Sequence, residues 1–119
     1  MAPPEGLMGQ SLLPGLKRAE GRLTWSWDPV DVKDARCETG CGAVAAEISR
    51  LLGGDRCLIR PKSAAPMLGA FRGKHWQWTY HVVVIKDALV YDITTGSDGV
   101  EMDIYKSFWE YADYIDFGF

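Results

Sequence analysis

The sequence has no excess of positive charge, since its 13 lysines and arginines are outnumbered by 16 aspartates and glutamates. A protein that binds a nucleic-acid backbone needs a basic footprint, so we expect no nucleic-acid partner. Apolar stretches such as residues 80–85 are far too short to span a bilayer, so we expect no membrane partner. The first residues, Met-Ala-Pro-Pro-Glu-Gly, lack the basic start and apolar run of a signal peptide, and none is predicted.

Cysteine and histidine are also scarce, with three and two copies among 119 residues. An odd number of cysteines excludes a fully paired disulfide scaffold, because one thiol must stay free or pair with another chain. The spacing Cys37-x-x-x-Cys41 lacks the paired knuckles of a structural zinc site. We therefore expect no metal and no other cofactor, and a zinc-stabilised interaction domain remains only an alternative.

The composition is that of an ordinary globular domain, with 47% hydrophobic and 24% charged residues. Residues 1–20 contain three prolines and three glycines and show little periodicity. This pattern predicts a linker or mobile N-terminal arm over residues 1–20. Residues 21–119 then form one folded domain, which the length allows.

The clearest predicted helix covers residues 41–52. Apolar residues recur there at the three-and-four spacing of one helix face, and Gly53-Gly54 ends the pattern. The residues of this face are Val44, Ala45, Ile48, Leu51 and Leu52.

The remaining pattern predicts mainly antiparallel strands. Residues 76–85 carry aromatic and β-branched side chains on both faces, which is typical of a central strand. Asp87-Ala88 interrupts this run and residues 89–93 form a second strand, so the pair predicts a hairpin. The other expected elements are short strands at 23–27 and 57–60, loops at 28–40 and 61–74, a turn at 94–99, and a helix at 103–114 with Ile104, Phe108, Tyr111 and Ala112 on its inner face. A helix followed by such strands indicates an α+β fold.

Cys41 lies in the first turn of the predicted helix 41–52. Unpaired N–H groups and the positive end of the helix dipole favour a thiolate at such a position. The same N–H groups can stabilise the oxyanion of an acyl-transfer intermediate. Cys41 also belongs to the apolar face, so its thiol is predicted to point toward the strands.

His81 is a polar residue inside the most apolar strand of the sequence, and Asp92 ends the partner strand. A hairpin loop of two or four residues puts both side chains on one face of the sheet, directly opposite or diagonal. A carboxylate beside one ring nitrogen fixes the histidine tautomer and leaves the other nitrogen for a thiol. Cys41, His81 and Asp92 thus predict a nucleophile, a base and the residue that orients the base.

Three segments carry a resemblance to papain-like cysteine enzymes. Gly-Cys-Gly-Ala-Val-Ala-Ala-Glu-Ile-Ser-Arg-Leu-Leu-Gly at 40–53 resembles their nucleophile helix, as found in bacteriocin-processing peptidases and bacterial transglutaminase-like domains. His-Val-Val-Val-Ile at 81–85 and Leu-Val-Tyr-Asp at 89–92 resemble the histidine strand and the acidic strand. With a tryptophan segment near Trp109, residues 36–110 are similar to the papain-fold toxin domains at the C-termini of bacterial polymorphic toxins.

The resemblance implies a minimal papain-like α+β fold, with the N-terminal nucleophile helix packed on a small antiparallel sheet. It implies a catalytic triad of Cys41, His81 and Asp92 that acts as a protease, a protein glutamine deamidase or a transglutaminase. The expected context is a secreted or delivered bacterial effector in the cytoplasm of a target cell. Its partners would be a protein substrate there and a cognate immunity protein. Papain also has a glutamine shortly before its nucleophile. This sequence has none between Gln10 and Gln77, so the second oxyanion donor stays unassigned.

Simpler interpretations stand beside this one. Cys41 is also suited to fill the core, His81 to bond a core carbonyl, and Asp92 to open a turn. Cys37 is a competing nucleophile and a candidate for a disulfide with Cys41 or Cys57. The tryptophan pair Trp76 and Trp78 fits the core or a partner contact better than a substrate groove. The alternative function is a catalytically silent binding module with the same fold.

Overall fold

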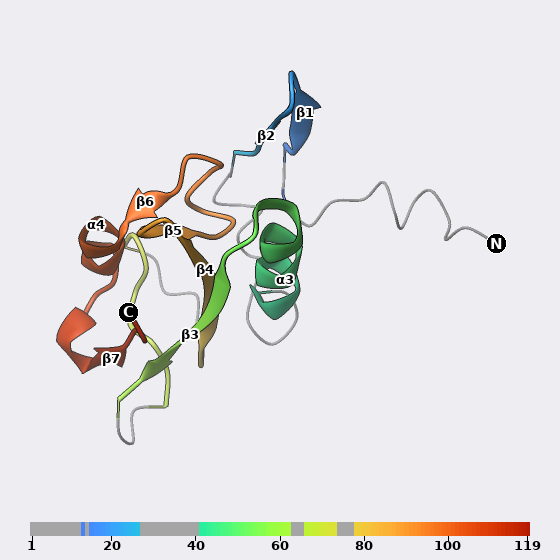
Figure 1. Cartoon of the computed structure of the whole chain (residues 1–119). Helices are drawn as coiled ribbons and strands as arrows, with labels where there is room; N and C mark the ends of the chain where they lie inside the picture. Colours follow the sequence, from blue (N-terminus) through green and yellow to red (C-terminus); the bar gives the residue numbers. More distant parts are fainter. Residues whose placement is uncertain (1–12, 14, 27–40, 63–65, 74–77) are drawn as a thin grey trace.

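A computed structural model describes residues 13, 15–26, 41–62, 66–73 and 78–119 (Figure 1). These residues form an α+β fold around a five-stranded antiparallel sheet with the strand order β6-β5-β4-β3-β7. The helix α3 packs beside β3 and β4, and α4 lies beside β5 and β6. The elements are β1 (Lys17–Ala19), β2 (Arg22–Thr24), α3 (Cys41–Leu52), β3 (Asp55–Pro61), β4 (His81–Lys86), β5 (Leu89–Tyr91), β6 (Val100–Glu101), α4 (Met102–Ser107), the 3-10 helix η2 (Ala112–Tyr114) and β7 (Ile115–Asp116).

The helix α3 has the bounds that the sequence predicts. Its apolar face packs against the sheet, with Val44, Ala45 and Ile48 buried. Two glycines with positive φ angles, Gly53 and Gly54, reverse the chain at its C-terminus. There the ammonium of Lys86 donates a 2.6 Å hydrogen bond to the carbonyl of Leu52. The C-terminal ends of α3 and β4 are therefore fixed together.

The predicted central hairpin is present as β4 and β5, but both strands are shorter than expected. Its two-residue turn, Asp87-Ala88, has positive φ at both positions, as the twist of a two-residue hairpin requires. The strand predicted from residue 76 begins only at His81, because the carbonyl of Trp78 accepts a hydrogen bond from Leu68 instead of a sheet neighbour. The partner strand ends at Tyr91 because the next residues form a turn. The strand predicted at 57–60 is longer, as β3.

The helix predicted at 103–114 is wrong in length. Of its four expected inner residues, Phe108 and Ala112 pack against the core, whereas Ile104 and Tyr111 do not. The helix ends at Ser107, and the following chain pairs with residues 70–72 through the bonds Arg72 N–H to Phe108 O and Glu110 N–H to Ala70 O. These bonds take the backbone groups that a longer helix would use. Ile104 and Tyr111, expected inside, are 49% and 65% exposed. The buried residues of this region are instead Tyr105 and Trp109.

The N-terminal part joins the fold earlier than the expected boundary between 20 and 21. Residues 17–19 pair with residues 22–24 as the hairpin β1–β2, so the strand predicted at 23–27 is displaced. Leu13 before the hairpin and Trp25 after it are buried in the core. Their apolar area anchors a segment whose prolines and glycines suggested an arm. Residues 1–12 and the predicted loop at 28–40 lie outside the described part of the chain.

Aromatic rings packed around Phe71 form a large part of the core. The ring of Phe71 lies 5.9 Å from that of Trp78, 5.7 Å from that of Tyr105 and 4.7 Å from that of Trp109, measured between centroids. This cluster joins the segment before β4 to α4 and the segment after it. None of the described helices is long and apolar enough to cross a membrane.

Gly54 is predicted to be irreplaceable for packing reasons. A Cβ atom there would lie 2.8 Å from the carbonyl oxygen of Ile85, whereas a Cβ at Gly53 meets nothing within 4 Å. Both positions have positive φ, which costs a non-glycine residue about 1–2 kcal/mol. We expect Gly53→Ala to cost about that much and Gly54→Ala clearly more. The free energies of unfolding in urea measure both, and equal losses would contradict the close approach of this turn to β4.

Candidate functional site

His81 and Asp92 meet at one end of the β4–β5 hairpin. The register pairs Val84 with Tyr91, so the next position would pair Val83 with Asp92. Alternate residues of a strand share a face, so Asp92 lies diagonal to His81 on that face, one of the two arrangements predicted. The Nε2 atom of His81 is 3.0 Å from Oδ2 of Asp92, and both residues are 1% exposed.

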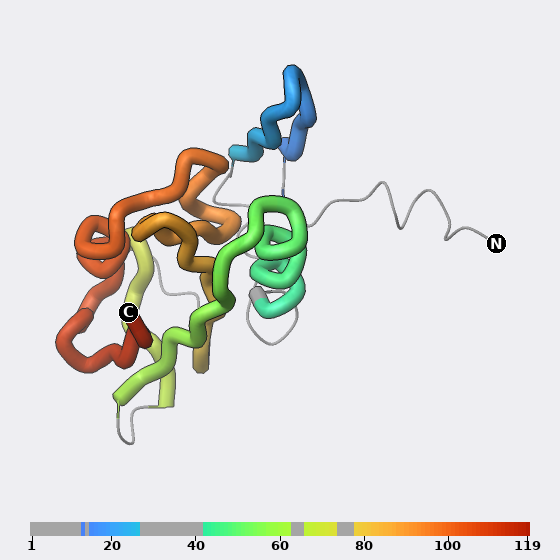
Figure 2. Tube along the Cα trace, viewed as in Figure 1, coloured from blue at the N-terminus to red at the C-terminus, as the bar shows by residue number. Residues whose placement is uncertain are grey.

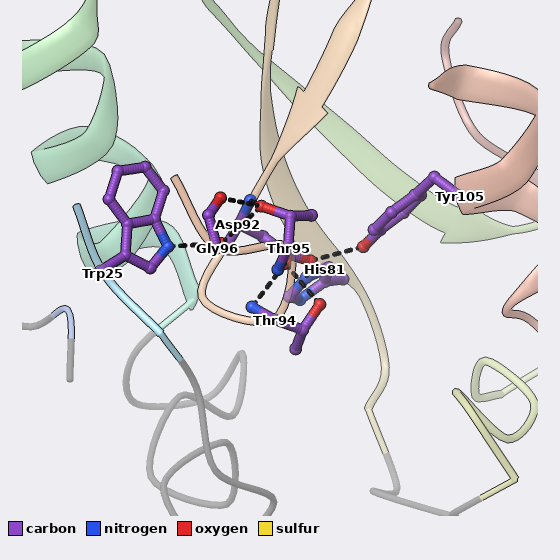
Figure 3. A network of polar contacts seen from close by, with 7 residues as sticks. All are labelled: Trp25, His81, Asp92, Thr94, Thr95, Gly96 and Tyr105. Carbon is purple, nitrogen blue, oxygen red and sulfur yellow. Dashed lines mark hydrogen bonds and ion pairs between the residues drawn. The ribbon is translucent and has the colours of Figure 1, made fainter. Parts of the chain in front are cut away.

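The carboxylate of Asp92 is surrounded by hydrogen-bond donors (Figure 3). Its Oδ1 atom accepts bonds from the backbone N–H and the hydroxyl of Thr94, at 2.7 and 2.6 Å, and from the N–H of Thr95, at 3.0 Å. Its Oδ2 atom accepts a 2.6 Å bond from the Tyr105 hydroxyl beside the contact with His81. A buried carboxylate needs such partners, since burying an unpaired charge is costly.

These donors decide the protonation of Asp92. Burial by itself raises the pKa of a carboxyl group, but the bonds from His81, Thr94 and Tyr105 and the charge of His81 together lower the pKa of Asp92 below its ordinary value. Asp92 is therefore an anion at neutral pH and acts only as an acceptor. Nε2 of His81 is then the donor in this contact.

The backbone around Asp92 is fixed as well. The indole N–H of Trp25 donates a 3.2 Å bond to the carbonyl of Asp92 (Figure 3). The hydroxyl of Thr95 lies 3.1 Å from the N–H of Asp92 and 3.0 Å from its carbonyl. The Asp-x-Thr-Thr sequence thus closes a tight turn on itself, and the turn-opening role foreseen for Asp92 coexists with its contact to His81.

The imidazole of His81 packs against two tryptophans, whose own ring centroids lie 5.8 Å apart. Trp78 stacks on it with ring centroids 4.6 Å apart and an interplanar angle of 4°, and the ring of Trp109 lies 5.9 Å away. These contacts leave the ring little freedom to rotate. Trp78 is buried, in agreement with the core role favoured for it. Trp76 lies outside the described residues.

Cys41 is the first residue of α3. The backbone places this end of the helix at the same end as the start of β4, where His81 lies. From Leu52 back to Cys41 the helix spans about 16 Å at its usual rise. From Lys86 back to His81 the strand spans about 17 Å. Leu52 and Lys86 are bonded to each other, and the tube trace shows α3 and β4 running in the same direction (Figure 2). The start of α3 and the start of β4 therefore lie at the same end of the two elements.

Cys57 does not fit a nucleophile. Its Sγ atom lies 3.2 Å from the carbonyl of Phe117, in a half-buried position on β3. Burial, and secondarily the charge of Asp116, raises the pKa of this thiol, which disfavours the reactive thiolate. Cys57 is also free of disulfide bonds, so the suggested bridge from Cys37 to Cys57 is excluded. Cys37 itself lies outside the described residues. Within the described part, no three His, Cys, Asp or Glu residues cluster as metal ligands.

Sequence reasoning missed Tyr105 and Thr94 as partners of Asp92. The Thr94 contacts had a local signal, since aspartate often bonds the N–H two residues further on. Tyr105 had none, because its contact depends on how α4 packs against the sheet. The predicted inner face of this helix included its neighbour Ile104 instead.

Comparison with known proteins gives no relative: no protein-family model, no curated protein and no solved structure matches this chain.

The lowered pKa of Asp92 predicts a specific acid sensitivity. A carboxyl whose pKa is lower in the folded state stabilises the fold above its ordinary pKa, about 3.9. This stabilisation is lost as the pH falls through the lower folded-state value. We expect Asp92→Asn to reduce the free energy of unfolding at pH 7 by about 3 kcal/mol or more, because its donors lose a charged partner. The variant should also lose less stability than the wild type between pH 5 and the acid range.

Denaturant titrations across this pH range measure the effect. Asp98→Asn is the matched control, since it removes an exposed carboxylate outside the network. Its free energy of unfolding should depend on pH as that of the wild type does. An Asp92→Asn curve parallel to that of the wild type would mean that the carboxylate has no special role.

Proposed function

We propose that this protein is a cysteine-nucleophile enzyme that transfers acyl groups, with Cys41 as nucleophile, His81 as general base and Asp92 as the residue that orients His81. The observation that carries the proposal is the bond between Nε2 of His81 and Oδ2 of Asp92, at 3.0 Å. It holds the imidazole in the tautomer with a proton on Nε2. In the proposed mechanism Nδ1 is the atom that takes the proton of the thiol, as in the nucleophile, base and orienter arrangement.

A second support is the position of Cys41 at the start of a twelve-residue helix that begins at the same end as β4, whose first residue is His81. The helix dipole and the unpaired N–H groups of this turn favour a thiolate and an oxyanion. Cys57, the other cysteine that the structure describes, lies in an environment that raises its pKa. The choice of Cys41 over Cys57 therefore follows from chemistry as well as from chain order.

The proposed reaction has two stages. Nδ1 of His81 takes the proton of the Cys41 thiol, and the sulfur attacks the carbonyl carbon of an amide. Collapse of the tetrahedral intermediate breaks the C–N bond, His81 returns the proton to the leaving nitrogen, and a thioester remains on Cys41. His81 then removes a proton from water or from a second amine, which attacks the thioester and restores the thiol.

The identity of the attacked amide and of the second nucleophile decides between three activities. A backbone amide with water gives proteolysis, a glutamine side chain with water gives deamidation, and a glutamine side chain with an amine gives cross-linking. The resemblance to papain-fold toxin domains favours a protein substrate in a target cell. It also favours a cognate immunity protein that restrains the enzyme in the producing cell.

The burial of the pair favours a second candidate function. Both His81 and Asp92 are 1% exposed, as expected of a satisfied polar pair inside a core. On this view the domain keeps the papain-like arrangement for stability and binds a protein without catalysis. The two candidates differ in one property, the reactivity of the Cys41 thiol.

Alkylation of the folded protein separates the two candidates. With limiting iodoacetamide near pH 7, we expect Cys41 to be modified well before Cys57, because only a thiolate reacts rapidly. His81→Ala should slow the labelling of Cys41 and leave that of Cys57 unchanged. Mass spectrometry of the digested protein gives the rate at each cysteine. Equal rates at both residues would favour the silent binding module.

Variants test the activity itself. Cys41→Ala should abolish cleavage, deamidation or cross-linking of proteins in exposed cells, with a loss on the order of a thousandfold or more. His81→Ala should be nearly as damaging, and Asp92→Asn less so. Cys57→Ser is the matched control and should keep activity. Proteomic comparison of treated cells distinguishes new termini, an added mass of about one dalton per deamidation and heavier cross-linked species. Full activity in a folded Cys41→Ala variant, or its loss in Cys37→Ala alone, would show that the nucleophile is another residue.

A further inference from the structure

Tyr105 shares one oxygen atom of Asp92 with His81. Its hydroxyl donates a 2.6 Å hydrogen bond to Oδ2, the same atom that lies 3.0 Å from Nε2 of His81. Figure 3 shows the tyrosine reaching this carboxylate from α4, on the side away from Trp25. The site therefore has a fourth polar member that comes from a separate element.

The packing of Tyr105 holds its hydroxyl in place. The residue is fully buried, and its ring lies 5.7 Å from that of Phe71 and 6.4 Å from those of Trp109 and Phe119. One of these rings, that of Trp109, also packs against His81. A buried tyrosine hydroxyl needs a partner, but the choice of Oδ2 has a consequence for the neighbouring histidine.

Anchoring of Asp92 does not depend on this bond. Three donors from Thr94 and Thr95 already hold Oδ1 and the turn. A further donor on Oδ2 stabilises the anion and draws its charge away from the N–H of His81, since both donors bind the same oxygen. The bond therefore affects the strength of the His81–Asp92 interaction more than the position of the turn.

We propose that Tyr105 is a positioning residue that limits how strongly Asp92 attracts the proton-bearing side of His81, and so tunes the basicity of the histidine. The inference rests on the proposed function for its role in catalysis, but the coupling from Tyr105 through Asp92 to His81 is a property of the folded protein alone. In this proposal Tyr105 acts through Asp92.

Among the described residues, two titratable side chains are joined to His81 by hydrogen bonds, one directly and one through Asp92. Asp92 follows β5 and contacts the ring directly, and Tyr105 on α4 acts through it. Loss of the Tyr105 hydroxyl reaches His81 through the oxygen of Asp92 that both residues contact.

The test is Tyr105→Phe, with Tyr91→Phe as the matched control. Tyr91 directly precedes Asp92 in the chain, is half-buried like many strand residues and lies next to Trp25 instead of the carboxylate. NMR titration of the His81 ring protons should give a higher midpoint pH in Tyr105→Phe than in the wild type, and an unchanged midpoint in Tyr91→Phe. The pH profile of Cys41 alkylation should move in the same direction.

A second pair of variants keeps the proposal testable if Tyr105→Phe folds poorly. Placing 3-fluorotyrosine at position 105 makes the phenol a stronger donor of nearly the same shape, and should lower the His81 midpoint. In the Asp92→Asn background, Tyr105→Phe should no longer move it, because the charge that the two donors share is gone.

An unchanged His81 midpoint in both Tyr105→Phe and the fluorotyrosine protein would overturn the proposal, and so would a shift of equal size in the Asp92→Asn background. Failure of the proposed function has a different signature. Cys41 would then label no faster than Cys57, while the NMR titration would still show the coupling between Tyr105 and His81.

Discussion

The buried carboxylate of Asp92 is the constraint on which the rest of this structure depends. An ionised group that is 1% exposed is tolerated only when its hydrogen bonds are satisfied. The turn after β5, the start of β4 and α4 each supply a donor, and Trp25 binds the carbonyl of the same residue. The turn itself and three further parts of the chain thus converge on one residue, and their arrangement around the sheet follows from that requirement.

The aromatic cluster gives this polar centre its rigid surroundings. The ring of Phe71 contacts those of Trp78, Tyr105 and Trp109, and Trp78 in turn stacks on His81. Displacing one of these rings would move either the histidine or the tyrosine that bind Asp92. Stability and the geometry of the candidate site are therefore coupled, because the same side chains form the core and hold the imidazole.

The sequence was sufficient where the signal is local. The helix Cys41–Leu52 shows its three-and-four spacing and its terminal glycines, and the two-residue turn of the β4–β5 hairpin puts His81 and Asp92 on one face. Prediction failed where tertiary contacts decide. The helix after Met102 stops at Ser107 because the chain beyond it pairs with residues 70–72, and β4 starts late because Trp78 leaves the strand to cover His81. Leu13 joins the core from a segment whose composition suggested an arm.

If Cys41 is the nucleophile and His81 its base, as we propose, the two act as one proton-transfer unit. The most direct measurement is the ultraviolet absorbance of thiolate as a function of pH in the wild type, with the contribution of Cys41 isolated by subtracting Cys41→Ala. We expect the thiolate absorbance of Cys41 to be present already near neutral pH in the wild type. In His81→Ala it should be absent near neutral pH. A Cys41 signal that appears only near the ordinary thiol pKa of about 8.5, and equally in both backgrounds, would contradict the proposal.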